Sequence, residues 1–348
     1  MSLSFEISRH ELRFLRPAGT SRGVYTTREI RLIRLRQTLD SITCEGLGEC
    51  APLPGLSKDE FAPGYDERLA AFAESVCSTG RIEHEAMREY PSMLFGLETA
   101  MLRLRAKSEA LFDTPFSRGE DGIPINGLIW MGNADYMNEQ IERKIEQGST
   151  CIKIKIGAID FDSELEILRS IRSRFSPLSL ELRVDANGAF SPHEVHKKLD
   201  ALAAFSLHSI EQPIPAGQSK HMARLCSISP IPIALDEELI GVNQAADKQE
   251  LLDFIKPRYI VIKPSLHGAM HGGEEWIRLA EERGIGHWIT SALESNVGLN
   301  AIAQWTAHIH PHGIGMHQGL GTGALFENNF PSPLNIIGEK LYYGNAQR

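Results

Sequence analysis

The sequence lacks long hydrophobic runs. No apolar stretch approaches the roughly 20 residues that a membrane-spanning helix requires, so a protein held by such a helix is excluded. Basic residues are fewer than acidic residues: the chain has 36 Lys and Arg and 45 Asp and Glu, which gives a net charge of −9. This balance repels a polyanionic backbone, and we expect no nucleic-acid partner.

Cysteine is scarce as well, and its distribution excludes two common uses. The cysteines are odd in number and show no C-x-x-C spacing, which argues against a disulfide framework and against a zinc ribbon. We interpret them as reduced structural thiols: Cys44, Cys50, Cys77, Cys151 and Cys226. The N-terminal residues contain no basic patch followed by an apolar core, so we predict a cytoplasmic protein.

The 348 residues suffice for two domains or for one large barrel with an attachment. In the first part of the chain, the β-rich run 29–35 predicts a strand, and helical patterns cover 65–76 and 91–108. The glycine-containing stretch 46–55 is expected to be a loop. Residues 324–348, rich in Pro, Asn and Gly, are expected to form a tail that packs back on the N-terminal region.

From about residue 123 to 320, short β-branched runs alternate with longer helical patterns. This alternation predicts a parallel sheet, and eight strands over this length favour a (β/α)8-type barrel over an open sheet. The expected strands are 123–130, 151–157, 180–187, 208–214, 232–238, 259–265, 286–292 and a weak one at 313–319. The expected helices are 135–147, 162–175, 192–205, 217–226, 244–254, 273–283 and 297–308.

Charged residues stand at the expected ends of these strands, where barrel enzymes place their reacting groups. Strand two ends in Lys153-Ile154-Lys155, and the period-two geometry of a strand points both lysines to the same side. The next four strands end in Asp185, Glu211, Asp236 and Lys263. One such residue alone is usually a cap or turn residue, but the ordered set on five successive strands indicates an active site.

Three carboxylates that converge repel one another and therefore demand a cation. Ligands that are all oxygen favour Mg²⁺, with Mn²⁺ as a substitute, and disfavour zinc. Lys155 is the candidate base, because Lys153 places a second positive charge beside it. Lys263 approaches from the other side, as a second acid/base or as an electrostatic stabiliser.

The strand-end motifs resemble those of the enolase superfamily, in its muconate-lactonizing subgroup, and are most similar to the o-succinylbenzoate synthase family. These motifs are Lys153-Ile154-Lys155, Arg183-Val184-Asp185-Ala186-Asn187, Ile210-Glu211-Gln212-Pro213, Leu235-Asp236-Glu237, Ile262-Lys263-Pro264 and the run 289–295. The resemblance implies a (β/α)7β TIM-like barrel at 123–323 with an α+β capping domain made of 1–122 and the tail 324–348. Cap loops near 16–24 and 52–56 would then screen the substrate.

The resemblance also implies roles for individual residues. It places the metal ligands at Asp185, Glu211 and Asp236, with Mg²⁺ as the cofactor, and the catalytic lysines at Lys155 and Lys263. Supporting positions would be Lys153, Arg183, Asn187 and Glu237. The implied reaction is the syn dehydration of a cyclohexadiene carboxylate in menaquinone synthesis. Lys155 would remove the α-proton and return it to the departing hydroxyl, and Lys263 would stabilise the enediolate by a cation–π contact.

The region after strand seven bears on the substrate. Dipeptide epimerases of this superfamily usually carry Asp-x-Asp at the eighth strand to hold the substrate ammonium. The run from His317 to Gly323 carries no acid, so the resemblance disfavours a cationic dipeptide substrate. Backbone N–H groups of Gly319, Leu320 and Gly321 and of Thr290-Ser291 are instead expected to bind the free end of a succinyl carboxylate. N-succinylamino acid racemase and dipeptide epimerase remain enzymatic alternatives, and a non-catalytic binding barrel remains one from another class. The oligomeric state stays open.

Two further features have simpler interpretations. His308, His310 and His312 suggest a metal site, but Pro311 and Gly313 should end the helix before His312 joins its face, so a surface or interface role is expected. The four tryptophans lie in apolar runs and are expected in the core: Trp130, Trp276, Trp288 and Trp305.

Overall fold

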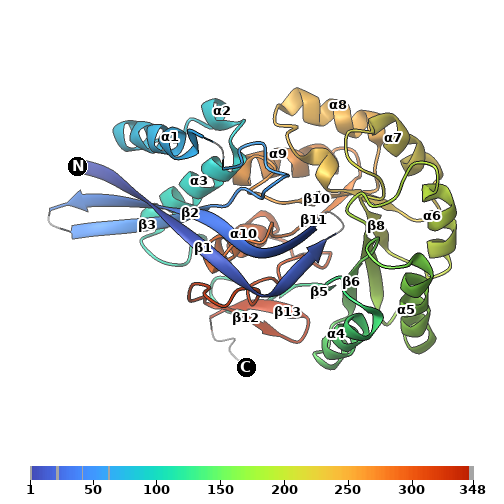
Figure 1. The fold of residues 1–348 in the computed structure, drawn as a ribbon. Helices are drawn as coiled ribbons and strands as arrows, with labels where there is room; N and C mark the ends of the chain where they lie inside the picture. The colour runs from blue at the N-terminus through green and yellow to red at the C-terminus, as the bar shows by residue number, and fades with distance from the viewer. Residues whose placement is uncertain (1, 21–22, 41, 62, 345–348) are drawn as a thin grey trace.

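The computed structural model describes residues 2–20, 23–40, 42–61 and 63–344. Its first part is a three-stranded antiparallel sheet packed on helices, at the left of Figure 1. The elements are β1 (Ser2–Thr20), β2 (Gly23–Leu39), β3 (Ile42–Cys50), α1 (Tyr65–Thr79), α2 (His84–Met87) and α3 (Pro91–Ala106). The predicted strand 29–35 lies within β2, and both predicted helices are present.

The expectation of a loop at 46–55 is wrong in its first half, because β3 runs through Gly46 and Gly48. A Cβ atom at Gly46 would lie 1.9 Å from the backbone oxygen of Ala100, and one at Gly48 would lie 1.8 Å from that of Gly96. Glycine is therefore required here so that the strand can lie directly on the backbone of α3. Gly46 and Gly48 thus allow close packing of β3 on α3 and do not form a turn.

The second part is a curled parallel sheet of seven strands in the order β11-β10-β9-β8-β7-β6-β5, with helices around it (Figure 1). The strands are β5 (Gly127–Ile129), β6 (Cys151–Lys155), β7 (Glu181–Asp185), β8 (Ser209–Glu211), β9 (Ile233–Leu235), β10 (Tyr259–Ile262) and β11 (Gly286–Ile289). The helices are α4 (Ala134–Glu146), α5 (Phe161–Arg174), α6 (Val195–Ala203), α7 (Ser219–Ile228), α8 (Ala245–Ile255), α9 (Ala269–Glu281) and α10 (Asn296–Ile309). Strands and helices alternate as the sequence predicts.

The barrel closes differently from the expectation of eight strands. In the described chain, 313–319 contains no strand and contributes only isolated bridges, Gln318 to Ile125 and Gly319 to Thr290. The chain then continues into the hairpin of β12 (Leu334–Ile337) and β13 (Lys340–Tyr343), which pairs with β4 (Ile123–Pro124). We call the line between β5 and residues 318–319 the seam of the barrel.

The tail packs on the N-terminal sheet, as the sequence predicts. The rings of Phe14 and Phe326 lie 4.5 Å apart, and Leu15 donates its backbone N–H to the oxygen of Leu325 at 2.9 Å. Residues 345–348 of the predicted tail, and 21–22 of the predicted cap loop, lie outside the described residues.

Two buried charged residues join the cap to the barrel. Glu49 of β3 accepts hydrogen bonds from the backbone N–H groups of Ser295 at 2.8 Å and Gly298 at 2.9 Å, at the start of α10. Burial raises the pKa of this carboxyl. Arg28 of β2 donates to the backbone oxygens of Ala51 and Ala292. The cap sheet is thus fixed to the loop that follows β11.

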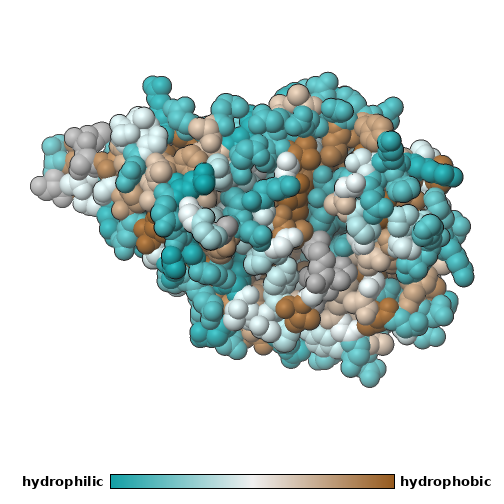
Figure 2. All heavy atoms as spheres, turned by 45° about the horizontal axis from the view of Figure 1, so that its top comes forward, coloured by the Kyte–Doolittle hydropathy of each residue, from teal (hydrophilic) through white to brown (hydrophobic). Residues whose placement is uncertain are grey.

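The surface agrees with the composition. Polar residues cover most of the face seen in Figure 2, and apolar residues form a short band near its middle. Within the described residues, none of the helices has the length and apolar character needed to cross a membrane.

Glu164, in the first turn of α5, holds the loop that follows β6. Its Oε1 atom accepts a hydrogen bond from the backbone N–H of Gly157 at 2.6 Å, and the residue is buried. Burial raises the pKa of this carboxyl from 4.5 to about 7, against the opposing effect of that hydrogen bond. Glu164 therefore titrates near neutrality and fixes a loop next to the strand that carries Lys155.

We expect the free energy of unfolding to fall as pH rises from about 4.5 to about 7, because in this window the folded protein holds a proton on Glu164 that the unfolded chain releases. Glu164→Gln should remove about 3 kcal/mol of this dependence. Urea unfolding at a series of pH values measures it. The exposed Glu166→Gln on the same helix is the matched control, and parallel pH profiles of wild type and Glu164→Gln would contradict the assignment.

Candidate active site

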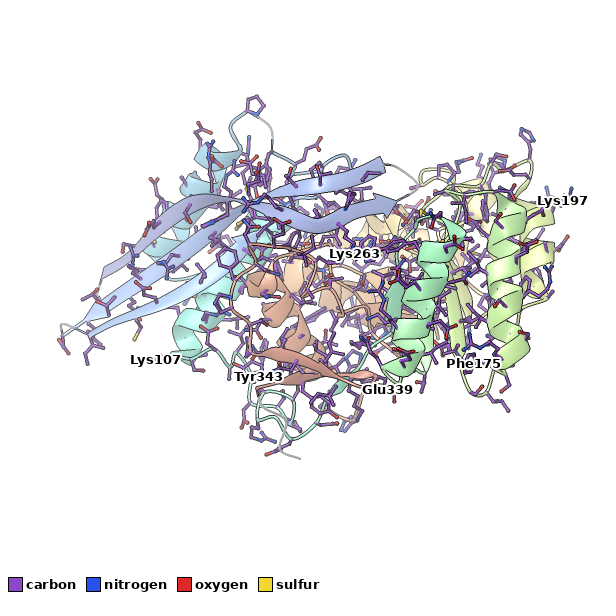
Figure 3. The ribbon with its side chains drawn as sticks, turned by 60° about the horizontal axis from the view of Figure 1, so that its bottom comes forward. Lys107, Phe175, Lys197, Lys263, Glu339 and Tyr343 are labelled. Atoms are coloured by element: carbon purple, nitrogen blue, oxygen red, sulfur yellow. The ribbon has the colours of Figure 1, made fainter. Side chains whose placement is uncertain are left out.

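The strand register brings the predicted residues to one end of the sheet. Lys155 pairs with Asp185 across β6 and β7, and Asp185 pairs with Glu211 across β7 and β8. Asp236 and Lys263 follow directly after β9 and β10. Figure 3 shows Lys263 near the middle of the molecule, beneath the long cap strands. The carboxyl ends of five neighbouring strands therefore share one site.

Both lysines of β6 point to this site, as the period-two argument predicts. Lys153 Nζ lies 2.7 Å from Glu211 Oε2 and 3.0 Å from Asp185 Oδ2. Lys155 Nζ lies 3.0 Å from the same Asp185 oxygen and 2.7 Å from Asn187 Oδ1. Asp185 thus accepts from two ammonium groups at once, which fixes the position of Lys155.

Lys263 forms a separate pair on the other side of the sheet, where its Nζ donates to Asp236 Oδ2. Burial alone would lower the pKa of Lys263, but the charge of Asp236 outweighs it and the pKa is raised. The pKa of Asp236 is lowered, because Lys263 outweighs the burial that would raise it. Both members of the pair are held in their charged forms.

The carboxylates of β7 and β8 respond in opposite directions. Burial would raise the pKa of Asp185, but the charges of Lys153 and Lys155 lower it. Burial, together with the negative charge of Asp185, raises the pKa of Glu211. A further positive charge nearby would therefore stabilise the ionised form of Glu211 most among these carboxylates.

The carboxylate oxygens are the type of ligand that a divalent cation binds, and two of them have no hydrogen-bond partner among the described residues. Glu211 Oε1 and Asp236 Oδ1 are buried and form no hydrogen bond to any described residue. Buried acceptors are normally satisfied, so these oxygens call for a ligand. Asp185 contributes a third carboxylate, and an all-oxygen set suits a hard cation.

A different group brings its potential ligand atoms within 4.8 Å of one another: Cys151, Glu181 and His317. The three strand-end carboxylates form no such close group, because lysines lie between them. Arg183 Nε donates to Glu181 Oε1 at 2.7 Å, and a guanidinium this close repels a cation. We therefore assign no metal to the cysteine-containing group.

The predicted supporting residues separate into two sets. Asn187 donates its backbone N–H to Asp185 Oδ1 at 3.0 Å and its side-chain amide to Glu237 Oε1 at 3.0 Å, so both belong to the network. Lys153 contacts two carboxylates directly and lines the cavity. Arg183 does not join them, because its guanidinium bonds to Glu181 and lies over the Trp288 ring at 4.5 Å. The expectation that Arg183 supports the carboxylates is wrong.

A cavity of about 80 Å³ opens above the network. The cap residues Leu53 and Leu56 line it, which agrees with the expected screening loop at 52–56. Asp59 holds this loop to the start of α3, since its Oδ2 accepts from the backbone N–H of Ser92 at 2.8 Å. The cavity therefore has a floor from the barrel and a cover from the N-terminal part of the chain.

Of the residues predicted to bind substrate, Thr290, Ser291, Gly319 and Gly321 line the cavity, whereas Leu320 is fully buried and does not line it. Their backbone donors are mostly in use. The N–H of Thr290 bonds to Ile262 oxygen at 2.9 Å, that of Ser291 to Gly319 oxygen at 3.3 Å, and that of Gly319 to Ile289 oxygen at 2.8 Å. The expectation that these three N–H groups bind a carboxylate is therefore wrong, because barrel closure engages them.

Several residues that line the cavity were not predicted. Asn126, Leu128 and Trp130 lie in the segment 123–130, which was expected to be the first barrel strand. Their alternate spacing along a strand could have indicated that they share one face, as Lys153 and Lys155 do. Trp130 is only half-buried, so its expected place in the core is wrong. Trp288 is buried as expected but also lines the cavity.

The histidine cluster does not form a shared site. Helix α10 ends before His312, as the sequence predicts. The ring of His308 stacks on Phe112 with centroids 4.2 Å apart, and His310 Nε2 lies 3.1 Å from His287 Nε2. The rings of His308 and His310 therefore face different neighbours.

Comparisons with known proteins agree with this geometry. Residues 136–338 match the family model described as enolase C-terminal domain-like. An o-succinylbenzoate synthase from Desulfotalea psychrophila is 47% identical over 98% of this chain and 98% of its own length. The crystal structure of MenC from the same organism is 42% identical, covers 98% of this chain and 100% of its own, and superposes with a TM-score of 0.80.

A dipeptide epimerase from Enterococcus faecalis, solved as a complex with Mg and a dipeptide, has a TM-score of 0.82 over 99% of this chain and 98% of its own. It is 19% identical, so this likeness concerns the fold alone. The barrel with its capping domain is thus an architecture that these proteins share.

We expect Asp236→Asn to weaken divalent-metal binding at least tenfold, because it removes one charged oxygen ligand and leaves Lys263 unpaired. Isothermal titration with Mg²⁺ and Mn²⁺ measures the affinity. Asp200→Asn, an exposed change on α6, is the matched control. Metal affinity that stays at the wild-type value in Asp236→Asn would remove this residue from the ligand set.

Proposed function

This chain belongs to the enolase superfamily, and from that premise we propose that it is a divalent-metal-dependent dehydratase of the o-succinylbenzoate synthase type. The substrate is 2-succinyl-6-hydroxy-2,4-cyclohexadiene-1-carboxylate and the product is 2-succinylbenzoate, a step of menaquinone biosynthesis. The observation that carries the proposal is the similarity along the whole chain to a synthase, joined to a complete set of strand-end lysines and carboxylates around one cavity.

We assign the metal to Asp185, Glu211 and Asp236, with Mg²⁺ as the ion and Mn²⁺ as a substitute. The unpartnered oxygens of Glu211 and Asp236 and the all-oxygen donor set support this choice. When bound, the cation supplies positive charge to the substrate carboxylate, where negative charge develops as the α-proton leaves.

Lys155 is the proposed acid/base. Asp185 and Asn187 hold its Nζ at 3.0 Å and 2.7 Å, which orients it toward the cavity. Acting as the base, it takes the proton from the carbon next to the carboxylate, and the C–H electrons move into an enediolate. The enediolate then expels the ring hydroxyl, which receives the same proton from Lys155 and leaves as water. The ring becomes aromatic, and Lys155 has given up the proton that it took, so the cycle is complete.

Lys263 lies across the sheet from Lys155, because β10 and β6 are separated by three strands. Its ammonium is anchored by Asp236 and faces the cavity. We assign it the stabilisation of the enediolate through a cation–π contact. A dehydration on one face needs one base, so Lys263 need not exchange a proton.

The alternative is racemisation of N-succinylamino acids or epimerisation of dipeptides, in which Lys155 and Lys263 would both act as bases. The region 317–323 supplies no acid for a substrate ammonium, which disfavours the dipeptide reaction. A non-catalytic barrel would be expected to lack a lysine or a carboxylate of the set, and this chain retains all of them.

We also propose the division into a cap of residues 1–122 with the tail 324–348 and a barrel of residues 123–323. The bond from Leu15 to Leu325 and the ring contact of Phe14 with Phe326 support joining the tail to the cap. Leu53 and Leu56 of the cap would exclude water from the reacting groups.

A spectrophotometric assay with the cyclohexadiene substrate tests the proposal. We expect turnover with Mg²⁺ at about 10⁴ M⁻¹s⁻¹ or above, and loss of turnover in excess EDTA. Absence of turnover by a folded, metal-loaded sample would contradict the dehydratase assignment. Exchange of the α-proton of N-succinylamino acids with solvent deuterium would then test the racemase.

We expect Lys155→Ala to abolish turnover by at least 10³-fold, because it removes the group that carries the proton. The affinity for the metal should change less in Lys155→Ala than in Asp236→Asn, because Lys155 donates to Asp185 and is not itself a ligand. Stopped assays and metal titration measure the two effects separately. Lys197→Ala, on the outer edge of the barrel in Figure 3, is the control, and near-full turnover in Lys155→Ala would refute its role as the base.

A further inference from the structure

The chain that follows β10 curls back on Lys263 and carries a buried histidine, His267. The backbone oxygen of Lys263 accepts the N–H groups of Leu266 at 2.9 Å and of His267 at 3.0 Å, so the segment forms a tight turn. The backbone N–H of Lys263 donates to Nδ1 of the His267 ring at 3.0 Å. His267 therefore binds the main chain of Lys263 on both sides of its Cα atom.

The N–H of Lys263 points to the side of the sheet where β9 has ended. The oxygen of the preceding residue, Ile262, faces β11 and accepts the N–H of Thr290 at 2.9 Å. Because successive backbone groups of a strand point to opposite sides, the N–H of Lys263 faces β9. There β9 ends at Leu235 and the chain continues into a short 3-10 helix. The His267 ring thus supplies the acceptor that a neighbouring strand supplies elsewhere in the barrel.

This bond fixes the state of the His267 ring. A backbone N–H can only donate, so Nδ1 is the acceptor and the ring proton lies on Nε2. His267 is 1% exposed, and burial lowers its pKa to about 3, against the opposing charge of Asp236. The Nε2 atom is buried without a hydrogen-bond partner among the described residues. An apolar side chain would fill this space without that cost, so the contact of Nδ1 with Lys263 is what His267 contributes.

Other residues of the turn are anchored to distant segments. Ser265 donates its hydroxyl to the buried carboxylate of Glu294. Leu266 packs with Leu53 of the cap, which lines the active-site cavity. The turn is therefore fixed relative to both the barrel and the cap.

The first turn of α9 lies directly on His267. An added Cβ at Gly272 would be 2.6 Å from the backbone oxygen of His267, so glycine is required for this close approach. The buried Lys248 donates to the oxygen of Gly272 at 2.9 Å. Glu98 of α3 accepts the N–H of Met270 at 2.8 Å. These contacts hold the start of α9, and with it the backbone of His267.

We propose that His267 is a positioning residue for Lys263, because its Nδ1 atom holds the backbone from which the ammonium of Lys263 reaches Asp236 and the active-site cavity. The inference rests on the proposed function, in which Lys263 stabilises the enediolate. The Nζ atom of Lys263 donates to Asp236 Oδ2, and the residue lines the cavity. A turn of its backbone would move this charge away from the reacting carbon, and a displacement of about 1 Å can lower a rate by about 10²-fold.

Three replacements of His267 separate the acceptor from the volume of the ring. The side-chain oxygen in His267→Asn lies as many bonds from Cα as Nδ1, that in His267→Gln lies one bond further, and His267→Leu has no acceptor. We expect kcat for the dehydration to fall about tenfold or more in His267→Leu and His267→Gln, and to stay within about threefold of wild type in His267→Asn. KM should change little, because the charge of Lys263 acts on the enediolate more than on the bound substrate.

Hydrogen exchange of the Lys263 amide, followed by NMR in the Mg²⁺-loaded protein, measures the contact itself and needs no substrate. We expect this amide to exchange about tenfold faster or more in His267→Leu and His267→Gln, because it loses its acceptor, and near the wild-type rate in His267→Asn. His196→Leu, an exposed change on α6, is the matched control.

Results that follow the size of the side chain would overturn the proposal, since a kcat in His267→Gln above that in His267→Asn assigns the ring to packing. A rise in KM with unchanged kcat would assign it to substrate binding instead. Unchanged exchange of the Lys263 amide in His267→Leu would show that this N–H does not depend on Nδ1. If His267→Leu does not fold, the comparison of His267→Asn with His267→Gln decides by the same criteria.

The outcome is separable from that of the proposed function. A wild type that dehydrates the cyclohexadiene substrate, with equal kcat in all three variants, keeps the function and loses the positioning role. A wild type that does not dehydrate it loses the function. Amide exchange then still tests the contact, and α-proton exchange of N-succinylamino acids replaces dehydration as the measure of Lys263.

Discussion

The pairing of buried lysines with buried carboxylates at the strand ends is the constraint on which the rest of the structure depends. Asp185, Glu211 and Asp236 are each at most 1% exposed, and a buried charge without a partner costs several kcal/mol. Lys153 bridges two of them, and Lys263 takes the third. The same arrangement leaves single oxygens of Glu211 and Asp236 without partners. The barrel is therefore stable with its charges paired and still has capacity for a cation.

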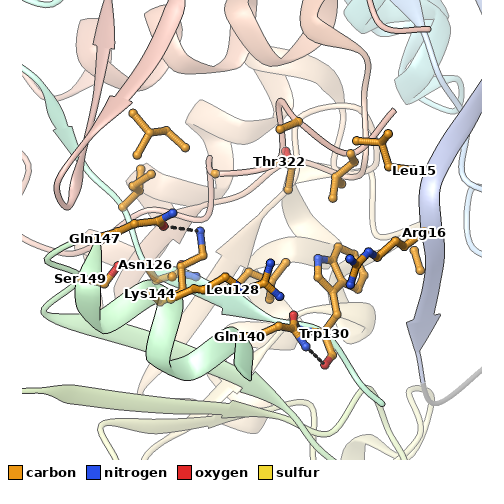
Figure 4. A pocket seen from close by; sticks show the side chains of 18 of the residues that line it. Leu15, Arg16, Asn126, Leu128, Trp130, Gln140, Lys144, Gln147, Ser149 and Thr322 are labelled. Carbon is orange, nitrogen blue, oxygen red and sulfur yellow. Dashed lines mark hydrogen bonds between the residues drawn. The ribbon is translucent and has the colours of Figure 1, made fainter. Parts of the chain in front are cut away.

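The seam accounts for the shape of the cavities on this side of the barrel. Seven regular strands pair continuously, whereas the last position closes through isolated bridges at Gln318 and Gly319. Closing the barrel engages backbone N–H groups that would otherwise be free to face the cavity. Because no eighth helix covers this side, α4 and the tail form its wall, and a groove remains between them (Figure 4).

The cap depends on charged residues that are buried far from the reacting groups. Glu49 and Arg28 tie β3 and β2 to the chain that follows β11. Asp59 fixes the loop carrying Leu53 and Leu56 on α3, and burial raises the pKa of this carboxyl to about 6. These contacts fix Leu53 and Leu56 relative to the barrel, so the shape of the cavity is set by bonds between distant segments.

The sequence alone determined the barrel class, the order of its helices and strands, and the strand-end residues Lys155, Asp185, Glu211, Asp236 and Lys263. It could do so because strand alternation and βα spacing are local, and the carboxyl ends of parallel strands must meet. Only the tertiary structure decided the rest. The glycine-containing segment forms a strand against α3, Arg183 is directed away from the carboxylates, the expected backbone donors are engaged, and Arg16 lies over the ring of Tyr136 on α4. Each of these results from contacts between segments distant in sequence, which no local pattern encodes.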